Sequence, residues 1–199
     1  MAKQSKELKE VHCKDRKTLR KWLIKDHEQK ESVWLILHKK NSTKGELSYK
    51  DAVEEGLCFG WIDSKANKLD EETYKFLYSP RKIKSVWSKV NKLRIKELIK
   101  AGQMHTSGLV KIALAKKDGS WTTLDAIEKL KMPGDLQKAF GQNEKAKQFF
   151  DAFPASIRKQ IYWWITSAKT EGTKNKRITE TVTLAEKNIR ANQYVPKNN

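Results

Sequence analysis

The chain has 199 residues, 38% of them hydrophobic, which is enough apolar surface for one sizeable core or two small ones. It carries 42 Lys and Arg against 24 Asp and Glu, a formal net charge of +18. It contains no run of about 18 apolar residues, which argues against a transmembrane helix, and two cysteines, Cys13 and Cys58, are too few for a disulfide framework.

The positive charge is concentrated in one segment. Residues 81–117 contain eleven basic residues and one acidic residue, Glu97. A field of this sign attracts nucleic acid, anionic lipid or acidic protein surfaces, although abundant lysine can also serve solubility alone. Residues 1–10 are rich in Lys and Glu and lack the apolar stretch of a secretory signal. We therefore expect a cytoplasmic protein whose cysteines are reduced.

Helix and strand patterns alternate in the first part of the chain. Asp15 can cap a helix that runs to about residue 28, and residues 32–38 form a continuous apolar run typical of a strand covered on both faces. A polar loop over residues 39–46 follows, and Ser48 can then cap a second helix.

A β-hairpin is predicted next. Residues 61–68 and 73–78 flank an acidic turn, and Tyr74, Phe76 and Tyr78 recur with the period of a strand. From there on the pattern is helical, with helices expected over residues 86–101, 107–116, 124–131, 133–141, 143–153, 156–169 and 178–191.

Because strands come early and helices late, the sequence predicts an α+β fold. We expect a small antiparallel sheet with helices in an α+β unit over residues 1–84. We expect residues 85–199 to form an all-helical C-terminal part that packs on that unit.

The helix after Ser85 has two contrasting faces. Lys89, Lys92, Lys96 and Lys100 fall on one stripe about 80° wide, a candidate polyanion-binding surface. Exposed aromatic side chains that could stack on bases are absent from this stripe, which argues against nucleic acid. Asn91 projects into the opposite, apolar face. A buried Asn must be hydrogen-bonded, so it either ties this helix to the hairpin or lines a pocket beside Trp87.

Several motifs together resemble one bacterial family. They lie at residues 57–64 (Leu-Cys-Phe-Gly-Trp-Ile-Asp-Ser), 79–82, 85–91, 118–121, 133–136 and 165–178. In this order they are similar to the YdeI/OmpD-associated proteins, also called bacteriocin-protection proteins, over about residues 10–190. One departure is Lys174, where the family tends to place Arg after the Thr that matches Thr173. The resemblance implies stress or bacteriocin protection and association with an outer-membrane porin, and it implies no reaction.

Searches for catalytic and metal-binding patterns find none. The histidines at positions 12, 27, 38 and 105 do not recur at helical spacing, and there is no phosphate-binding loop or nucleophile elbow. Cys58 lies between two apolar residues, which raise the pKa of a thiol and leave it inert. We expect no metal and no cofactor, and the sequence favours a binding protein over an enzyme.

One group of residues brackets the hairpin and its exit: Trp61, Asp63, Arg81, Trp87, Ser88 and Asn91. Antiparallel pairing of the predicted strands would bring Asp63 and Arg81 side by side. Two interpretations stay open, a ligand pocket with aromatic walls and a structural Asp63–Arg81 ion pair with both tryptophans in the core.

Three functional hypotheses follow. The first is a basic interaction protein in stress or bacteriocin protection, with an envelope protein or another protein as partner. The second is a polyanion binder without sequence preference that uses the lysine stripe. The third is a small-ligand binder or enzyme that uses the pocket at Trp61, Asp63 and Arg81.

Overall fold

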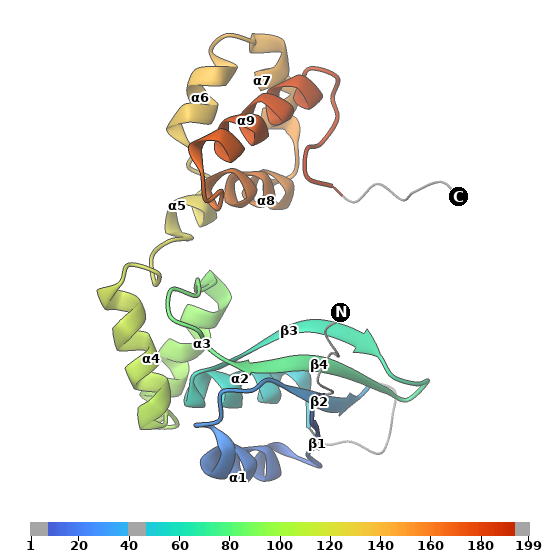
Figure 1. Cartoon of the computed structure of the whole chain (residues 1–199), viewed down its shortest axis with the longest axis vertical. Helices are drawn as coiled ribbons and strands as arrows, with labels where there is room; N and C mark the ends of the chain where they lie inside the picture. Colours follow the sequence, from blue (N-terminus) through green and yellow to red (C-terminus); the bar gives the residue numbers. More distant parts are fainter. Residues whose placement is uncertain (1–7, 40–46, 194–199) are drawn as a thin grey trace, which may run out of the picture. The chain divides into compact units, whose positions relative to one another are not determined.

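The computed structural model describes residues 8–39 and 47–193 (Figure 1). Two compact units, residues 1–123 and residues 124–199, each surround a hydrophobic core of their own. Strands occur in the first unit and helices make up the second, so the predicted α+β fold class is confirmed.

The first unit is built on a four-stranded sheet of order β1–β2–β4–β3. Its strands are β1 (Glu10–His12), β2 (Val33–His38), β3 (Trp61–Lys68) and β4 (Thr73–Pro80). The predicted hairpin forms the antiparallel pair β3–β4, and β2 pairs antiparallel with β4. The short strand β1 was not predicted. It pairs parallel with β2, placing Val11 opposite Leu35, so the sheet is mixed.

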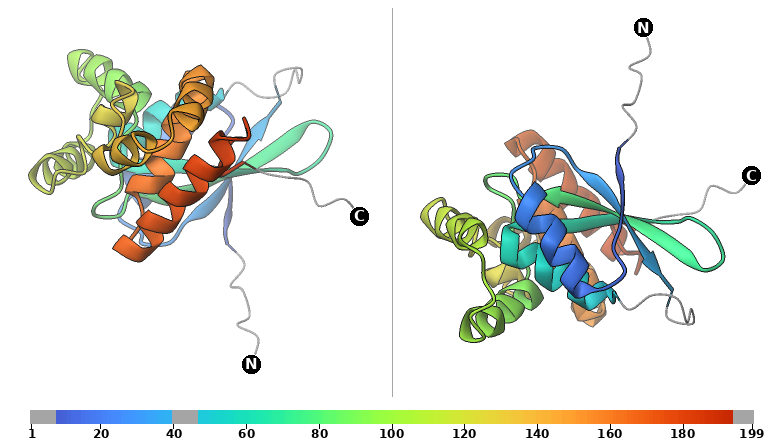
Figure 2. Two further views of the ribbon diagram at one scale, coloured as in Figure 1. Left: turned by 90° about the horizontal axis from the view of Figure 1, so that it is seen from above. Right: turned by 90° about the horizontal axis from the view of Figure 1, so that it is seen from below.

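Helices α1 (Arg16–Asp26) and α2 (Tyr49–Phe59) cover one face of this sheet (Figure 2). Both begin where the sequence predicts. The Asp15 carboxylate accepts the Thr18 N–H at 2.7 Å, and the Ser48 hydroxyl accepts the Asp51 N–H at 3.0 Å. These bonds satisfy N–H groups that have no partner inside the helix.

Helices α3 (Lys89–Lys100) and α4 (Thr106–Lys117) complete the first unit, because both pack on α2. The predicted boundary at residue 84 separates these helices from the sheet, whereas the structure groups them with it and divides the chain after Thr123. Gly108 permits the close approach of α4 to α2, since a Cβ at this position would lie 2.2 Å from the carbonyl oxygen of Cys58.

The second unit contains α5 (Asp125–Glu128), α6 (Gly134–Phe140), α7 (Glu144–Ala152), α8 (Ala155–Thr166) and α9 (Glu171–Ala185). Its core includes the fully buried Leu136, Phe150 and Ile161. Helix α9 begins earlier than the predicted residue 178, because the Thr170 hydroxyl caps it by accepting the Thr173 N–H at 3.2 Å.

Most of the predicted loop over residues 39–46 and of the Lys- and Glu-rich start lies outside the described residues. Among the helices of the described part, none is long and apolar enough to cross a membrane.

Candidate functional site

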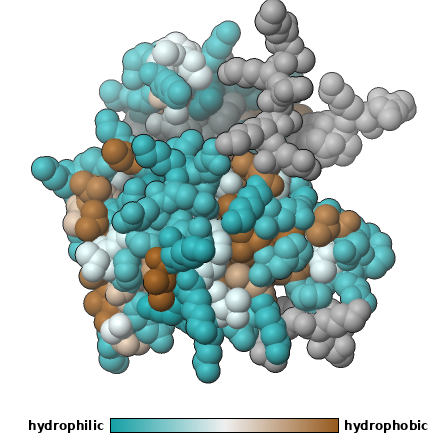
Figure 3. Space-filling view, turned by 60° about the horizontal axis from the view of Figure 1, so that its bottom comes forward, coloured by the Kyte–Doolittle hydropathy of each residue, from teal (hydrophilic) through white to brown (hydrophobic). Residues whose placement is uncertain are grey.

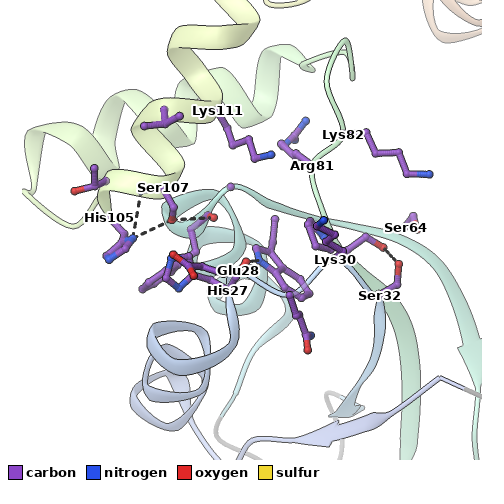
Figure 4. A pocket seen from close by; sticks show the side chains of 18 of the residues that line it. His27, Glu28, Lys30, Ser32, Ser64, Arg81, Lys82, His105, Ser107 and Lys111 are labelled. Atoms are coloured by element: carbon purple, nitrogen blue, oxygen red, sulfur yellow. Dashed lines mark hydrogen bonds between the residues drawn. The ribbon is translucent and has the colours of Figure 1, made fainter.

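A pocket of about 920 Å³ opens on the first unit where four segments meet (Figure 4). They are residues 27–32 after α1, the α2–β3 junction, the end of β4 and the first turns of α4. The pocket lies at the end of the β3–β4 pair, where Trp61 is opposite Pro80.

The α2–β3 junction holds two of these segments together through Gly60. This residue ends α2 in the left-handed conformation, with φ of 77°, which favours glycine. A Cβ here would lie 2.6 Å from Cγ of Lys111, so the Lys111 stem runs directly over the glycine. The Gly60 carbonyl accepts the Arg81 N–H at 2.9 Å. Gly60 thus brings α4 and the end of β4 to one point.

Arg81 is the most unusual residue of the lining. It is only 2% exposed, and its guanidinium carbon lies over the Trp87 ring, 3.6 Å from the ring centroid. Its Nη1 donates to the Val86 carbonyl at 3.3 Å, whereas Nε and Nη2 are buried without a hydrogen-bond partner in the described structure. Burial lowers the pKa of Arg81 to about 10, against the opposing effect of Asp63. Arg81 is therefore a buried cation with unused donors.

Other cations join Arg81 on the lining. Lys82 and Lys111 both line the pocket, and Figure 4 shows the Lys111 side chain reaching toward Arg81. No carboxylate of the described residues forms an ion pair with any of the three. Glu28 alone among the described lining residues is acidic. The pocket is thus strongly electropositive.

Uncharged donors point to the same ligand chemistry. Nε2 of Gln29, on the lining, is buried without a hydrogen-bond partner in the described structure. The N-terminus of α4 also reaches the lining through Thr106, and helix N-termini favour anions. Gln29 Nε2 thus adds a donor that has no acceptor among the described residues to the cations of the lining.

Two histidines stand at one side of the pocket. The His105 ring stacks on Phe59 with centroids 4.6 Å apart and meets the His27 ring edge-on at 4.8 Å. Nδ1 of His105 accepts the Ser107 N–H at 3.3 Å, which favours the tautomer with the proton on Nε2. Burial, aided by His27 and Arg20, lowers the pKa of His105. Both effects favour the neutral form of the His105 ring. Within the described residues, no group of three or more His, Cys, Asp or Glu is arranged to hold a metal.

The structure brings together part of the predicted constellation. Trp61 and Arg81 line the pocket, and Trp87 lies beneath the guanidinium. Asp63 forms no ion pair with Arg81, contrary to expectation, and instead accepts the Tyr49 hydroxyl at 2.5 Å. The strand register explains this, because it sets Asp63 opposite Tyr78.

Ser88 and Asn91 lie away from this pocket and have local roles. The Ser88 hydroxyl caps α3 by accepting the Asn91 N–H at 3.2 Å. The Asn91 side-chain oxygen accepts Nη1 of Arg94 at 3.3 Å, within the same helix. Of the two predicted roles of Asn91, a link to the hairpin and a place on a pocket lining, neither is seen among the described residues, and its side chain bonds within α3.

Three members of the lysine stripe, Lys89, Lys96 and Lys100, are exposed. Lys92 is half-buried, and its Nζ lies 5.5 Å from the ring centroid of Trp121. Binding of polyanions by this stripe stays a prediction.

Sequence reasoning missed Gln29, His105 and Lys111 as pocket residues. They come from segments far apart in the chain, and no local pattern links them. One available signal was the position of His105 and Thr106 directly before the predicted helix at Ser107, which places a helix N-terminus there.

Both cysteines are expected to be unreactive in the folded protein. Burial, with a smaller contribution from Asp15 for Cys13 and from Glu55 for Cys58, raises the pKa of each thiol to about 11. Because the thiolate is the nucleophile, labelling by iodoacetamide at pH 8 should be about 100-fold slower than for an ordinary thiol of pKa ~8.5. Mass spectrometry of native and urea-unfolded samples measures both rates, and equal rates would contradict this expectation.

The fold and the pocket define a two-unit α+β protein with a cationic cavity in its sheet-containing unit. Residues 11–111, just over half of the chain, match the family model described as a domain of unknown function (DUF8412), and residues 129–188 match the model described as bacteriocin-protection, YdeI or OmpD-associated. The chain belongs to the first family, and the second match lies within its C-terminal unit. No curated protein and no solved structure matches the chain.

The suspected YdeI/OmpD resemblance is thus confirmed, through residues 129–188. The motifs at residues 57–64 and 79–91 lie in the segment that matches the other family model. The pocket belongs to that segment as well, since its lining residues fall between His27 and Lys111.

Proposed function

We propose that the first unit binds a small organic anion whose carboxylate or phosphate group pairs with Arg81. The buried Arg81 guanidinium carries this proposal, because Arg81 lines the pocket and two of its nitrogens have no hydrogen-bond acceptor among the described residues. Leaving a buried charge unpaired costs several kcal/mol, on the order of 3–5. Groups that are unfavourable for the free protein are typical of binding sites, where a ligand completes them.

The walls of the pocket indicate what else the ligand carries. Phe59, Trp61 and Val110 present apolar surface to the cavity. Its volume of about 920 Å³ lies within the range of roughly 300–1,000 Å³ typical of small-molecule sites. An anion with an aromatic or aliphatic body fits both properties better than a bare inorganic ion.

Changing Arg81 to Met tests this function. We expect the variant to lose at least about 30-fold in affinity for benzoate or phenyl phosphate, because the desolvated charge pair is worth ~2 kcal/mol or more. The free variant should melt at the same temperature as the wild type or higher, since Met keeps the contact with Trp87 and removes unpaired buried donors. Calorimetric titration and thermal melts, with benzamide as the uncharged analogue, measure both quantities.

Arg158→Met is the matched control. Arg158, in the second unit, also has a buried Nε without a hydrogen-bond partner in the described structure, but it does not line this pocket. Its replacement should leave the ligand affinity unchanged. A purely structural role for Arg81 predicts the opposite pattern, in which Arg81→Met melts several degrees lower and anions and benzamide bind the wild type equally.

The family description suggests the wider role of the protein. We propose that the chain acts in stress or bacteriocin protection as a basic binding protein, and that occupation of the pocket is part of this role. The +18 net charge and the pocket cations Arg81, Lys82 and Lys111, which have no ion pair among the described residues, support binding to an anionic molecule.

A further inference from the structure

A surface beside the pocket combines exposed apolar side chains with lysines. Ile83, in the loop between β4 and α3, is 73% exposed, and Val110 and Leu114 of α4 are 50% and 44% exposed. We call this surface the basic–apolar patch, made of Ile83, Val110, Leu114, Lys82, Lys84, Lys111 and Lys117.

The loop and α4 form one continuous surface. A narrow crevice is lined jointly by Ile83 and Lys84 from the loop and by Lys111 and Leu114 from α4. The Lys84 N–H also donates to the Asp118 carboxylate at 3.3 Å, fixing the loop to the end of the helix.

Helix α4 exposes apolar side chains on its outer side as well as burying them on its inner side. Its inner side buries Gly108, Ile112 and Ala115 against the first unit. Val110, Leu114 and Lys117 follow one another at i, i+4 and i+7, so they share the outer side. In Figure 3, hydrophobic side chains lie along the left margin, the side on which Figure 1 draws α4. Apolar side chains exposed together on one surface often mark a contact with a partner or a membrane.

The charge of the patch is positive and poorly balanced. Asp118 is the acidic residue at its edge, and its carboxylate also accepts the Ser120 N–H at 2.9 Å. The patch thus combines lysines with exposed apolar side chains, as does a surface that contacts anionic lipid headgroups and the start of the acyl chains.

We infer that the basic–apolar patch binds the surface of an anionic lipid bilayer, with Ile83 inserted among the headgroups and the lysines against the phosphates. Ile83 protrudes from a loop, which suits insertion into a deformable layer. A protein partner would need about 800 Å² of complementary surface, and three apolar side chains beside a narrow crevice offer far less.

Vesicle sedimentation tests the inference. The wild-type chain should bind vesicles with 30% phosphatidylglycerol and ignore pure phosphatidylcholine. Each lysine near an anionic surface is worth a factor of about five, so Lys84→Gln with Lys117→Gln should weaken binding roughly 30-fold. Ile83→Ser with Leu114→Ser should weaken it about tenfold or more, through lost apolar burial. None of these four residues lines the pocket, so the result is independent of the proposed pocket ligand.

Helix α1 supplies matched controls. Ile24 is 57% exposed between the exposed Lys21 and Lys25, away from the patch. Ile24→Ser and Lys21→Gln with Lys25→Gln should leave vesicle binding unchanged. Equal losses from the α1 and patch variants would overturn the inference, as would binding that disappears only when Lys89, Lys96 and Lys100 are changed to Gln. Binding to an acidic polypeptide such as polyglutamate without any binding to anionic vesicles would also reject it.

Discussion

Replacing Gly108 with alanine is expected to lower the free energy of unfolding of the first unit by about 3 kcal/mol. The new Cβ would lie 2.2 Å from the Cys58 carbonyl oxygen and 2.7 Å from its carbon, and backbone atoms cannot move aside as a flexible side chain can. Helix α4 must then shift away from α2. The N-terminus of α4 lines the pocket, so affinity for anions should fall as well. Urea denaturation followed by tryptophan fluorescence measures the stability.

Gly172→Ala is the control for this substitution. Gly172 lies in the first turn of α9, and a Cβ there would have no heavy atom within 4 Å. Because alanine favours helix over glycine, this change should be neutral or stabilising by up to about 1 kcal/mol. If Gly108→Ala were equally harmless, the close α2–α4 contact would not exist in solution.

The second large effect concerns Glu55, which is only 1% exposed. Its carboxylate accepts Nε of Arg16 at 2.7 Å and Nη1 of Arg20 at 2.9 Å, joining α2 to α1. Glu55→Ala should lower the free energy of unfolding by about 3 kcal/mol. This is the lower end of the range for a broken buried pair, because the two arginines are a third exposed and regain some hydration. Urea denaturation of the variant checks the value.

Glu71→Ala provides the comparison for Glu55. Glu71 pairs with Lys68 at the surface, and its side chain is 86% exposed. Pairs of this kind contribute roughly 0–1 kcal/mol, so the substitution should change stability little. A similar loss for both variants would show that burial of Glu55 does not decide its contribution.

Local signals in the sequence predicted much of the fold. Asp15, Ser48 and the acidic hairpin turn mark element boundaries through bonds between near neighbours, which a single sequence reveals. Strand β1 escaped prediction because it is only three residues long, with exposed ends. The start of α9 was not predicted because its first turns are polar. They are held in place by contacts with other parts of the chain, such as the ion pair of Lys174 with Asp135 of α6.

The candidate site was less predictable, because it depends on strand register and on contacts between distant segments. Placing Trp61 and Arg81 together needed only the hairpin. The absence of an Asp63–Arg81 ion pair could be predicted only from the β3–β4 register, which sets Asp63 opposite Tyr78. Asp63 accepts a hydrogen bond from the Tyr49 hydroxyl instead. Lys111 can reach the pocket because its stem passes over Gly60, which has no side chain. A glycine in the sequence does not reveal which residue packs over it.

The separate cores of the two units bear on how such a chain can be inherited. Trp121 packs against the first core and Leu124 against the second, and none of the described residues belongs to both. Recombination between the codons for Trp121 and Leu124 would leave the hydrophobic core of each unit intact. The matched segments also end and resume on either side of this point, at residues 111 and 129. Recombination can therefore move the helical YdeI-type unit between genes as a cassette, leaving the sheet-bearing unit and its pocket to diversify under a different selection.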